Sequence, residues 1–243
     1  MLITAQQRQH FREQGYFILP DLFSEEEIDA LTARIDPFVV AHDAQLQTIG
    51  SAGISRANEI AFTAHLAEQD PDIMRFVAQE KFVQLASALL SADEISLYWD
   101  QSVYKKPEVP RDFPWHQDNG YTPTDPAEYL TCWLALVDVT VENGCVSVLP
   151  GSHLQGLIEH QDTAIGKQCY FGPDPGAPVE LKKGSVVAFS SLLFHRSGPN
   201  VSETTRKSYV IQYAAANTRH AVTGEPFKRV VIARHGKPVW NDH

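Results

Sequence analysis

His116 and Asp118 stand two residues apart in the stretch WHQDNGY, residues 115–121. Side chains two apart on an extended strand point to the same face of a sheet, so this imidazole and this carboxylate can bind one ion. One carboxylate and two histidines, with the remaining positions open, form the facial arrangement of non-haem Fe(II) oxygenases. A His-x-Asp pair alone is common, so the hypothesis of a metal site requires a second histidine downstream.

The second histidine that we select is His195, at the end of a predicted apolar strand. A histidine in a buried strand is more often a hydrogen-bonded core residue than a ligand, so the residues that follow His195 must show whether it is a metal ligand. Residues 197–200 (SGPN) have turn chemistry, and a strand resumes around Arg206. A hairpin centred on this turn would place His195 opposite Arg206 and Ser197 opposite Thr204. A hydroxyl and a guanidinium would then lie beside the proposed ligand.

Arg206 and Ser197 suit a dicarboxylic keto acid as cosubstrate. The keto oxygen and its adjacent carboxylate can chelate iron, whereas the distal carboxylate needs a planar and permanently charged fork, which Arg supplies and Lys does not. A single strand arginine usually covers a surface. Its combination with His116, Asp118 and His195 makes that simpler explanation weak.

The elements that must position these residues change in kind along the chain. Thr4 predicts a helix cap, and Gly15 is well placed to end that helix. Residues 16–19 are typical of a short strand, and Ser24 predicts a second helix to about Asp36. Residues 41–58 lose periodicity and are predicted to form a loop bordering the site. An apolar stripe over residues 82–90 predicts a further helix.

After Asp93 the hydrophobic period changes to two. On the first strand, alternation places Ile95, Leu97, Trp99 and Gln101 on one face. Strands are predicted at residues 95–105, 129–139, 145–149, 179–181, 185–194 and 207–215. Helices followed by many strands favour an all-β core, a sandwich or barrel, with a helical cover. The long Gly- and Pro-rich segment 150–178 is typical of a lid or binding loop.

Composition excludes several classes of function. The formal net charge of −10 leaves no positive field for phosphate backbones, which argues against nucleic acid as a partner. The first twenty residues contain no apolar signal region, and no apolar run is long enough to span a membrane. We expect a cytoplasmic protein with a small-molecule substrate and no evident protein partner. Cys132, Cys145 and Cys169 lack Cys-x-x-Cys spacing and are interpreted as ordinary thiols.

Taken together, these motifs resemble the phytanoyl-CoA dioxygenase family of Fe(II)- and 2-oxoglutarate-dependent oxygenases. The resemblance rests on WHQD at 115–118, GCVSVLPGSH at 144–153, and His195-x-Ser197 followed by Arg206. It extends to the N-terminal stretch 11–22 and so covers nearly the whole chain. It implies one domain over residues 1–243 with a double-stranded β-helix, or cupin-like jelly roll. The expected parts are a mainly helical cover (1–92), the jelly-roll core (93–217) and a C-terminal extension (218–243).

The resemblance also implies roles for individual residues. The residues expected to hold iron are His116, Asp118 and His195, and those expected to hold the distal carboxylate of 2-oxoglutarate are Arg206 and Ser197. Lys105 matches a polar family position that reaches the cosubstrate, and Gln101 shares its strand face. Trp133 matches an aromatic residue that lines the cosubstrate pocket. Because Asp118 is present where some relatives have a small residue and bind halide, halogenation is not expected.

The implied activity is oxidation of an unactivated C–H bond by O2, with 2-oxoglutarate converted to succinate and CO2. Hydroxylation is expected, with desaturation or ring formation as alternatives. Apart from Lys105-Lys106 and Lys182-Lys183 no compact basic patch suits the phosphates of coenzyme A, so a small metabolite is favoured over an acyl-CoA. Two other functions remain open, namely a cupin-like metalloenzyme without a keto acid and a noncatalytic metal- or ligand-binding barrel. These alternatives differ in iron binding and keto-acid dependence.

Overall fold

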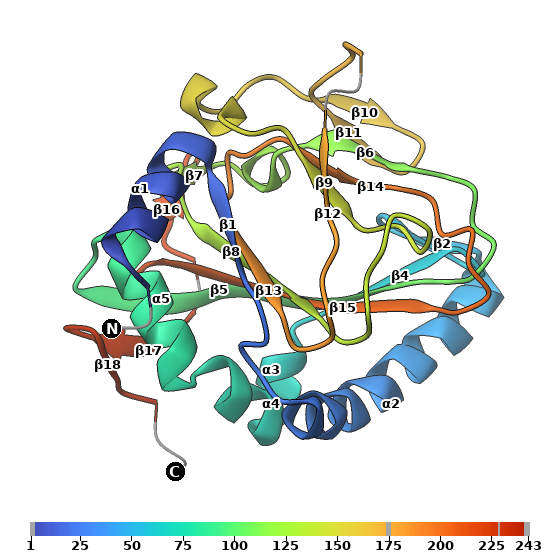
Figure 1. Ribbon diagram of the computed structural model, residues 1–243, viewed down its shortest axis with the longest axis horizontal. Coiled ribbons are helices and arrows are strands. Elements are labelled where there is room, and N and C mark those ends of the chain that lie inside the picture. The colour runs from blue at the N-terminus through green and yellow to red at the C-terminus, as the bar shows by residue number, and fades with distance from the viewer. Residues whose placement is uncertain (1–2, 174–175, 228, 241–243) are drawn as a thin grey trace.

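Two antiparallel β-sheets face each other, and helices cover the outer face of the larger sheet (Figure 1). This computed structural model describes residues 3–173, 176–227 and 229–240. Across the larger sheet the strands are β1 (Tyr16–Leu19), β13 (Val186–Ser190), β8 (Leu130–Ala135), β15 (Arg206–Ala215), β5 (Glu94–Lys105), β4 (Ile60–Ala64), β3 (Ser55–Arg56) and β2 (Ser51–Ala52), with β17 (Val230–Arg234) also paired to β5 and β18 (Lys237–Pro238) to β17. The smaller sheet has the order β12 (Ala177–Val179), β9 (Val146–Val148), β14 (His195–Ser197) and β6 (Phe113–His116). The expected all-β core with a helical cover is confirmed.

The remaining elements surround these sheets. The helices are α1 (Ala5–Gln14), α2 (Glu25–Ile49), α3 (Leu66–Gln69), α4 (Pro71–Val77) and α5 (Glu80–Leu90). Two small strand pairs lie outside the main sheets, β7 (Thr124–Asp125) with β16 (Arg219–His220), and β10 (Gln161–Thr163) with β11 (Gly166–Gln168). Single 3-10 turns span Asp118–Gly120 and Ser152–Gln155. The segment 150–178, predicted as a lid or binding loop, thus contains a hairpin of β10 and β11. Residues 174–175 of this segment lie outside the described residues.

Local sequence signals set the first helices. Thr4 and Ser24 each form the expected capping box, and Gly15 ends α1 in the left-handed conformation. The prediction that the second helix ends near Asp36 is wrong, because α2 continues through Pro37 to Ile49. Buried side chains such as Val39 and Leu46 continue along one face of this helix. Most residues between them are small or polar, so the sequence shows no clear helical periodicity beyond Asp36. The loop predicted over residues 41–58 is therefore wrong for its first half.

Two separate cores hold these layers together. Between the helices and the larger sheet, Phe82 packs against Tyr213, and Ile28 belongs to the same buried cluster; all three are fully buried. Between the sheets, Val187 and Trp133 of the larger sheet pack with Val148 of the smaller one. Burial of these aliphatic and aromatic groups is the main favourable term in folding. The functional residues lie at the edge of the second core.

A bulge changes the face of β5 partway along the strand. Trp99 pairs with Gln212 and Leu97 with Tyr213, so Tyr98 is an extra residue without a partner. Leu97 therefore packs in the core beneath the helices, whereas Trp99 faces the space between the sheets. The predicted alternation, which kept both on one face, is wrong on this point.

The predicted hairpin between His195 and Arg206 is also wrong. His195 begins β14 in the smaller sheet, where it pairs with His116 and Val148, while Arg206 begins β15 in the larger sheet opposite Lys105. The intervening turn is thus a crossover between sheets rather than a tight hairpin. The buried Asn200 stabilises this crossover by donating to the backbone carbonyls of residues 105, 106 and 204.

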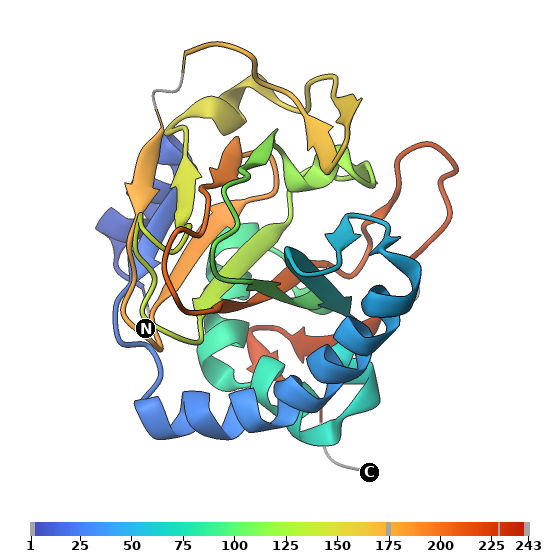
Figure 2. The ribbon, with the colours of Figure 1, turned by 90° about the vertical axis from the view of Figure 1, so that its right-hand side faces the viewer.

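Strands from both ends of the chain complete the larger sheet. β1 pairs with β13 at one edge, and β17, from the region predicted as a C-terminal extension, pairs with β5. Figure 2 shows the hairpin of β2 and β3 on the open side of the sheets, where Arg56 donates a hydrogen bond to the carbonyl of Ala164 in the β10–β11 turn. No helix in the described ranges is long and apolar enough to cross a lipid bilayer.

Gly184 provides a test of how α2 is docked on the sheet. It has φ +86°, and a Cβ there would lie 2.2 Å from the carbonyl oxygen of Phe23. We expect Gly184→Ala to lower the free energy of unfolding by about 3 kcal/mol, from the left-handed backbone plus the clash. In denaturant titrations Gly50→Ala, with φ +78° and open space around it, should cost only about 1 kcal/mol. Equal losses in the two variants would contradict this packing.

Candidate active site

The three predicted metal ligands lie close together where β6 and β14 of the smaller sheet pair. His116 ends β6 and His195 begins β14, and the two residues pair directly across the strands. Asp118 follows in a 3-10 turn, with its Oδ1 3.4 Å from Nε2 of His195 and 3.8 Å from Nε2 of His116. One ligand atom from each residue lies within 4.8 Å of the others. The triad inferred from spacing is therefore assembled in space.

Hydrogen bonds fix both imidazoles in the tautomer that a metal requires. Nδ1 of His116 lies 2.8 Å from the carbonyl oxygen of Pro114, and Nδ1 of His195 lies 3.0 Å from that of Leu193. A carbonyl oxygen can only accept, so each Nδ1 carries the proton and each Nε2 keeps its lone pair. Both lone-pair nitrogens lie beside Oδ1 of Asp118. This donor set fits a divalent metal ion.

The second oxygen of Asp118 is held by two residues that sequence reasoning missed. Oδ2 accepts hydrogen bonds from Oγ1 of Thr131 (2.6 Å) and from Nε2 of Gln212 (3.0 Å). Oδ1 is thereby left for a metal. The sequence contained a weak signal for both residues, because an even spacing on a strand places side chains on the same face. Gln212 is six residues after Arg206, and Thr131 is two residues before Trp133. Pairing between strands was needed to bring both near Asp118.

Electrostatics keep the triad in its metal-binding protonation state. Burial is the main cause that lowers the pKa of His116 to about 3. Burial opposes the ionisation of Asp118, but the neighbouring imidazoles and the hydrogen bond from Thr131 together outweigh it, and the pKa of the carboxyl is lowered to about 2. His116 is thus neutral and Asp118 is charged at neutral pH.

Arg206 is a buried cation for which the described chain offers no anion. Its side chain is 1% exposed, and Nη1 donates to Oγ of Ser208 (2.7 Å) and to the carbonyl oxygen of Val103 (3.3 Å). Its Nε has no hydrogen-bond partner, and no carboxylate of the described residues forms an ion pair with it. Burial lowers its pKa to about 10, which reflects the cost of holding this charge. An unpaired buried guanidinium of this kind indicates an anionic ligand.

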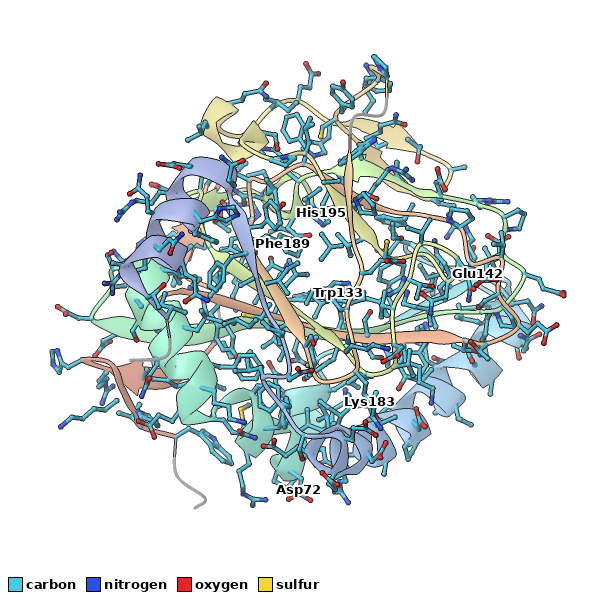
Figure 3. The ribbon with its side chains drawn as sticks, in the orientation of Figure 1. Asp72, Trp133, Glu142, Lys183, Phe189 and His195 are labelled. Atoms are coloured by element: carbon cyan, nitrogen blue, oxygen red, sulfur yellow. The ribbon has the colours of Figure 1, made fainter. Side chains whose placement is uncertain are left out.

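One cavity connects Arg206 with the triad. Trp133 lies beneath the guanidinium, 5.3 Å from its ring centre to Cζ, and Ser197 and Gln101 also line the cavity. Figure 3 shows Trp133, Phe189 and His195 in the space between the two sheets. The structure thus brings the sequence-predicted residues together around a single space.

Lys105 departs from this arrangement. It pairs with Arg206 across the strands, but its Nζ donates to the carbonyl of Gly198 (2.6 Å), to that of Arg111 (3.3 Å) and to Oγ of Ser197 (3.4 Å). It does not line the cavity of Arg206. Lys105 therefore contacts the hydroxyl of Ser197 from outside the cavity. Burial, followed by the charge of Arg206, lowers its pKa to about 7.

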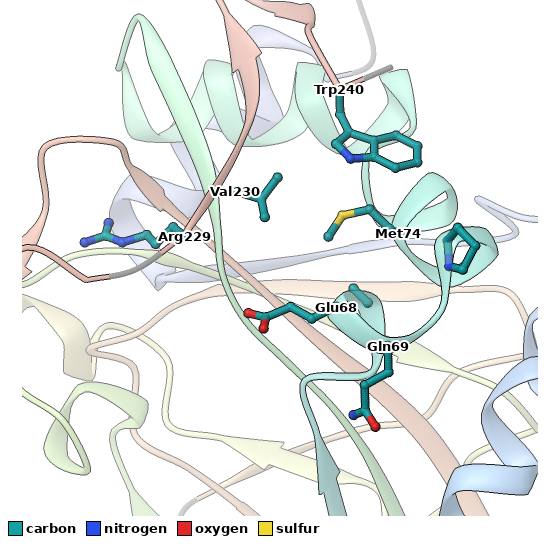
Figure 4. A pocket seen from close by; sticks show the side chains of 8 residues that line it. Glu68, Gln69, Met74, Arg229, Val230 and Trp240 are labelled. Carbon is teal, nitrogen blue, oxygen red and sulfur yellow. The ribbon is translucent and has the colours of Figure 1, made fainter. Parts of the chain in front are cut away.

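A second cavity of about 380 Å³ opens over the other side of the triad. It is lined by residues of β4, β5, β6 and β15 and by loop residues that include Tyr121 and Tyr129. The neighbouring Asn119 does not line it, because its side chain bonds the backbone of Ala127 and Thr124. A third cavity of about 400 Å³ lies between α3, α4 and β17 (Figure 4). Its lining residues include no histidine or cysteine, so the chemistry is concentrated in the first two cavities.

The sequence profile of the phytanoyl-CoA dioxygenase family matches residues 11–208. The chain belongs to this family. It is 28% identical over 247 residues to phytanoyl-CoA dioxygenase of Arabidopsis thaliana, covering 85% of this chain and 87% of that protein. It is 27% identical over 263 residues to ectoine dioxygenase of Sphingopyxis alaskensis, covering 97% and 84%.

Solved structures agree with the fold. EvdO2 from Micromonospora carbonacea, complexed with 2-oxoglutarate, has a TM-score of 0.73 at 24% identity over 92% of this chain and 95% of that one. The carbocyclase SnoK has a TM-score of 0.71 at 22% identity, over 93% and 94%. The jelly-roll fold is confirmed. Family membership likewise confirms the enzyme class expected from the sequence, an Fe(II)- and 2-oxoglutarate-dependent dioxygenase.

Thr131 allows a test of the support given to Asp118. Thr131→Val removes the hydroxyl while keeping the shape of the side chain, so Oδ2 loses its shorter hydrogen bond. We expect Fe(II) affinity to fall about 10- to 100-fold, measured anaerobically by competition with a chelator. Thr131→Ser keeps the donor and should retain near-normal affinity. Unchanged affinity in the valine variant would show that this hydrogen bond does not order the ligand.

Lys105 generates a pH prediction. Its pKa near 7 means that it gains a proton as the pH falls from 8 to 6, which adds positive charge beside Arg206. We expect the affinity for 2-oxoglutarate, measured with Fe(II) bound, to increase severalfold over this range because a dianion is attracted more strongly. Lys105→Met should abolish the change. A pH profile shared by both proteins would assign the titration to another group.

Proposed function

We propose that His116, Asp118 and His195 hold one Fe(II) and that the protein hydroxylates an unactivated C–H bond of a small-molecule metabolite. One observation carries the proposal: a single cavity joins a His-Asp-His triad to a buried arginine without an acidic partner. In this proposal the helical cover, both sheets and β17 form one oxygenase domain, because strands from both ends of the chain pair in the larger sheet.

In this proposal 2-oxoglutarate occupies the cavity between the triad and Arg206. The guanidinium offers Nε and its remaining Nη donors to the distal carboxylate, which is the planar fork that such an acid requires. Ser197 adds a hydroxyl, whose oxygen accepts a hydrogen bond from Nζ of Lys105 outside the cavity. Trp133 packs under the guanidinium, and Gln101 lies between the two cavities. A metalloenzyme without a keto acid has no need of this buried cation, so the cupin-like alternative is disfavoured.

The protein's own contribution is geometry and exclusion of water. When bound, iron with O2 and 2-oxoglutarate supplies an oxidant able to break an unactivated C–H bond, with succinate and CO2 as coproducts. Thr131 and Gln212 keep one carboxylate oxygen of Asp118 occupied, so that the other faces the metal. Both histidines present unprotonated Nε2 atoms. Apolar side chains such as Val103, Phe189 and Val210 line the cavity and limit the access of water to the reacting centre.

An anaerobic titration of the metal-free protein tests this proposal. Fe(II) followed by 2-oxoglutarate should produce the visible charge-transfer band of the chelate, and His116→Ala should lack it because one ligand is lost. If iron binds but no band forms, the keto-acid assignment is wrong. If iron does not bind, the triad is wrong.

Arg206 is tested separately in the same assay. Arg206→Ala should weaken 2-oxoglutarate binding about 10- to 150-fold, the range expected for loss of a charged hydrogen bond, while Fe(II) affinity stays unchanged. Arg206→Lys keeps the charge but loses the fork, and we expect an intermediate affinity. A wild-type affinity in the alanine variant would remove Arg206 from the cosubstrate site.

A further inference from the structure

The cavity over the triad has an unusual wall for a site expected to bind a metabolite. Its volume of about 380 Å³ suits a small organic ligand. Six of its thirteen lining residues are aromatic: Phe62, Tyr98, Trp99, Phe113, Tyr121 and Tyr129. The lining contains no lysine or arginine, and its one carboxylate, Asp118, is already engaged with Thr131, Gln212 and the proposed metal.

This lining disfavours charged ligands. A carboxylate or phosphate placed there would lose its hydration without gaining a cation. An ammonium group would gain cation–π contacts with the rings, but no free carboxylate would replace the larger hydration energy that it loses. The buried cation of the site, Arg206, instead faces the cosubstrate cavity, together with the hydroxyl of Ser197. The two cavities thus differ in the charge that they accept.

Tyr129 supplies a polar group aimed into this aromatic cavity. Four tyrosines of the described chain are buried, and three of them donate their hydroxyl within the protein: Tyr104 to Asp36, Tyr209 to Asp100 and Tyr213 to the carbonyl of Val77. The fourth, Tyr129, is 2% exposed, lines the cavity, and has no hydrogen bond from its hydroxyl to any described residue. The ring of Tyr129 is buried while its hydroxyl oxygen stays accessible from the cavity, so a ligand bound there can supply the acceptor.

Tyr98 extends this polar end of the cavity. It is the bulged residue of β5, which turns it to the same side as Trp99, and its ring centre lies 4.7 Å from that of Tyr129. Its hydroxyl likewise has no partner among the described residues. Phe227 packs edge-on against Tyr98 at 5.1 Å, and the guanidinium of Arg229 lies 5.7 Å from the ring centre. The C-terminal region thus supports this wall from outside.

We propose that the substrate is an uncharged molecule with an apolar, ring-containing body and a hydrogen-bond acceptor such as a carbonyl or ether oxygen, which Tyr129 and Tyr98 bind over the metal. The assignment rests on the proposed oxygenase function and deepens it. The aromatic faces pack on the apolar body, and the two hydroxyls anchor the acceptor. Because that anchor fixes the orientation of the molecule, it decides which C–H bond faces the metal.

A panel of size-matched probes tests the substrate class. The probes are camphor, its carboxylic acid ketopinic acid, bornylamine, the hydrocarbon bornane, larger neutral cyclic ketones and lactones, and a medium-chain acyl-CoA. With the Fe(II)–2-oxoglutarate chelate formed, two signals are followed: perturbation of the charge-transfer band and succinate release. We expect both signals from neutral ketones or lactones, and not from the acid, the amine, the hydrocarbon or the acyl-CoA.

Tyr129→Phe removes the proposed anchor and leaves the ring. We expect KM for the most active neutral probe to rise about tenfold, with more succinate released per molecule of product, while the affinity for 2-oxoglutarate is unchanged. Tyr98→Phe should show a smaller effect in the same direction. Tyr170→Phe is the matched control, because its hydroxyl bonds the carbonyl of Pro173 outside this cavity.

The outcomes separate this proposal from the oxygenase assignment. If the chelate band forms but charged probes are preferred, or no neutral probe gives a signal, the substrate class is wrong and the oxygenase function stands. Equal kinetics in Tyr129→Phe and wild type would remove the anchoring role. If the chelate band never forms, the proposed function itself fails.

Discussion

The antiparallel pairing of β6 with β14 is the constraint on which the site depends. It places His116 directly opposite His195, so that two distant parts of the sequence present their imidazoles side by side. β14 is held on its other edge by β9, which leaves His195 little freedom to move away. Asp118 needs only the short turn after β6 to join them. Anything that loosened this smaller sheet would separate the ligands without touching them.

A second constraint is electrostatic. Arg206 begins β15 and Lys105 ends its antiparallel partner β5, so the two buried side chains lie opposite each other, and neither has a carboxylate partner among the described residues. Holding two cations there is costly, as their lowered pKa values show. A dianionic cosubstrate would offset that cost, so the fold is expected to be more stable when it is bound. The neighbouring aromatic cavity carries no such charge, which separates cosubstrate from substrate.

Much of this arrangement could be predicted from the sequence. The spacing of His116 and Asp118 and the position of His195 identified the triad, and the change of period after Asp93 identified the β core. The hairpin argument failed because turn residues such as 197–200 also suit a crossover between sheets. Spacing gave only a weak signal for Thr131 and Gln212, because their role depends on strand pairing.

The bulge at Tyr98 has a consequence for the variability of the chain. Because this residue has no partner across the strands, deleting it would restore a regular ladder and leave Leu97 and Trp99 facing the same sides as before. The deletion of one residue elsewhere in β5 would reverse every side chain beyond it. Tyr98 is thus a position where evolution or engineering can add or remove a wall group while the rest of the strand keeps its register.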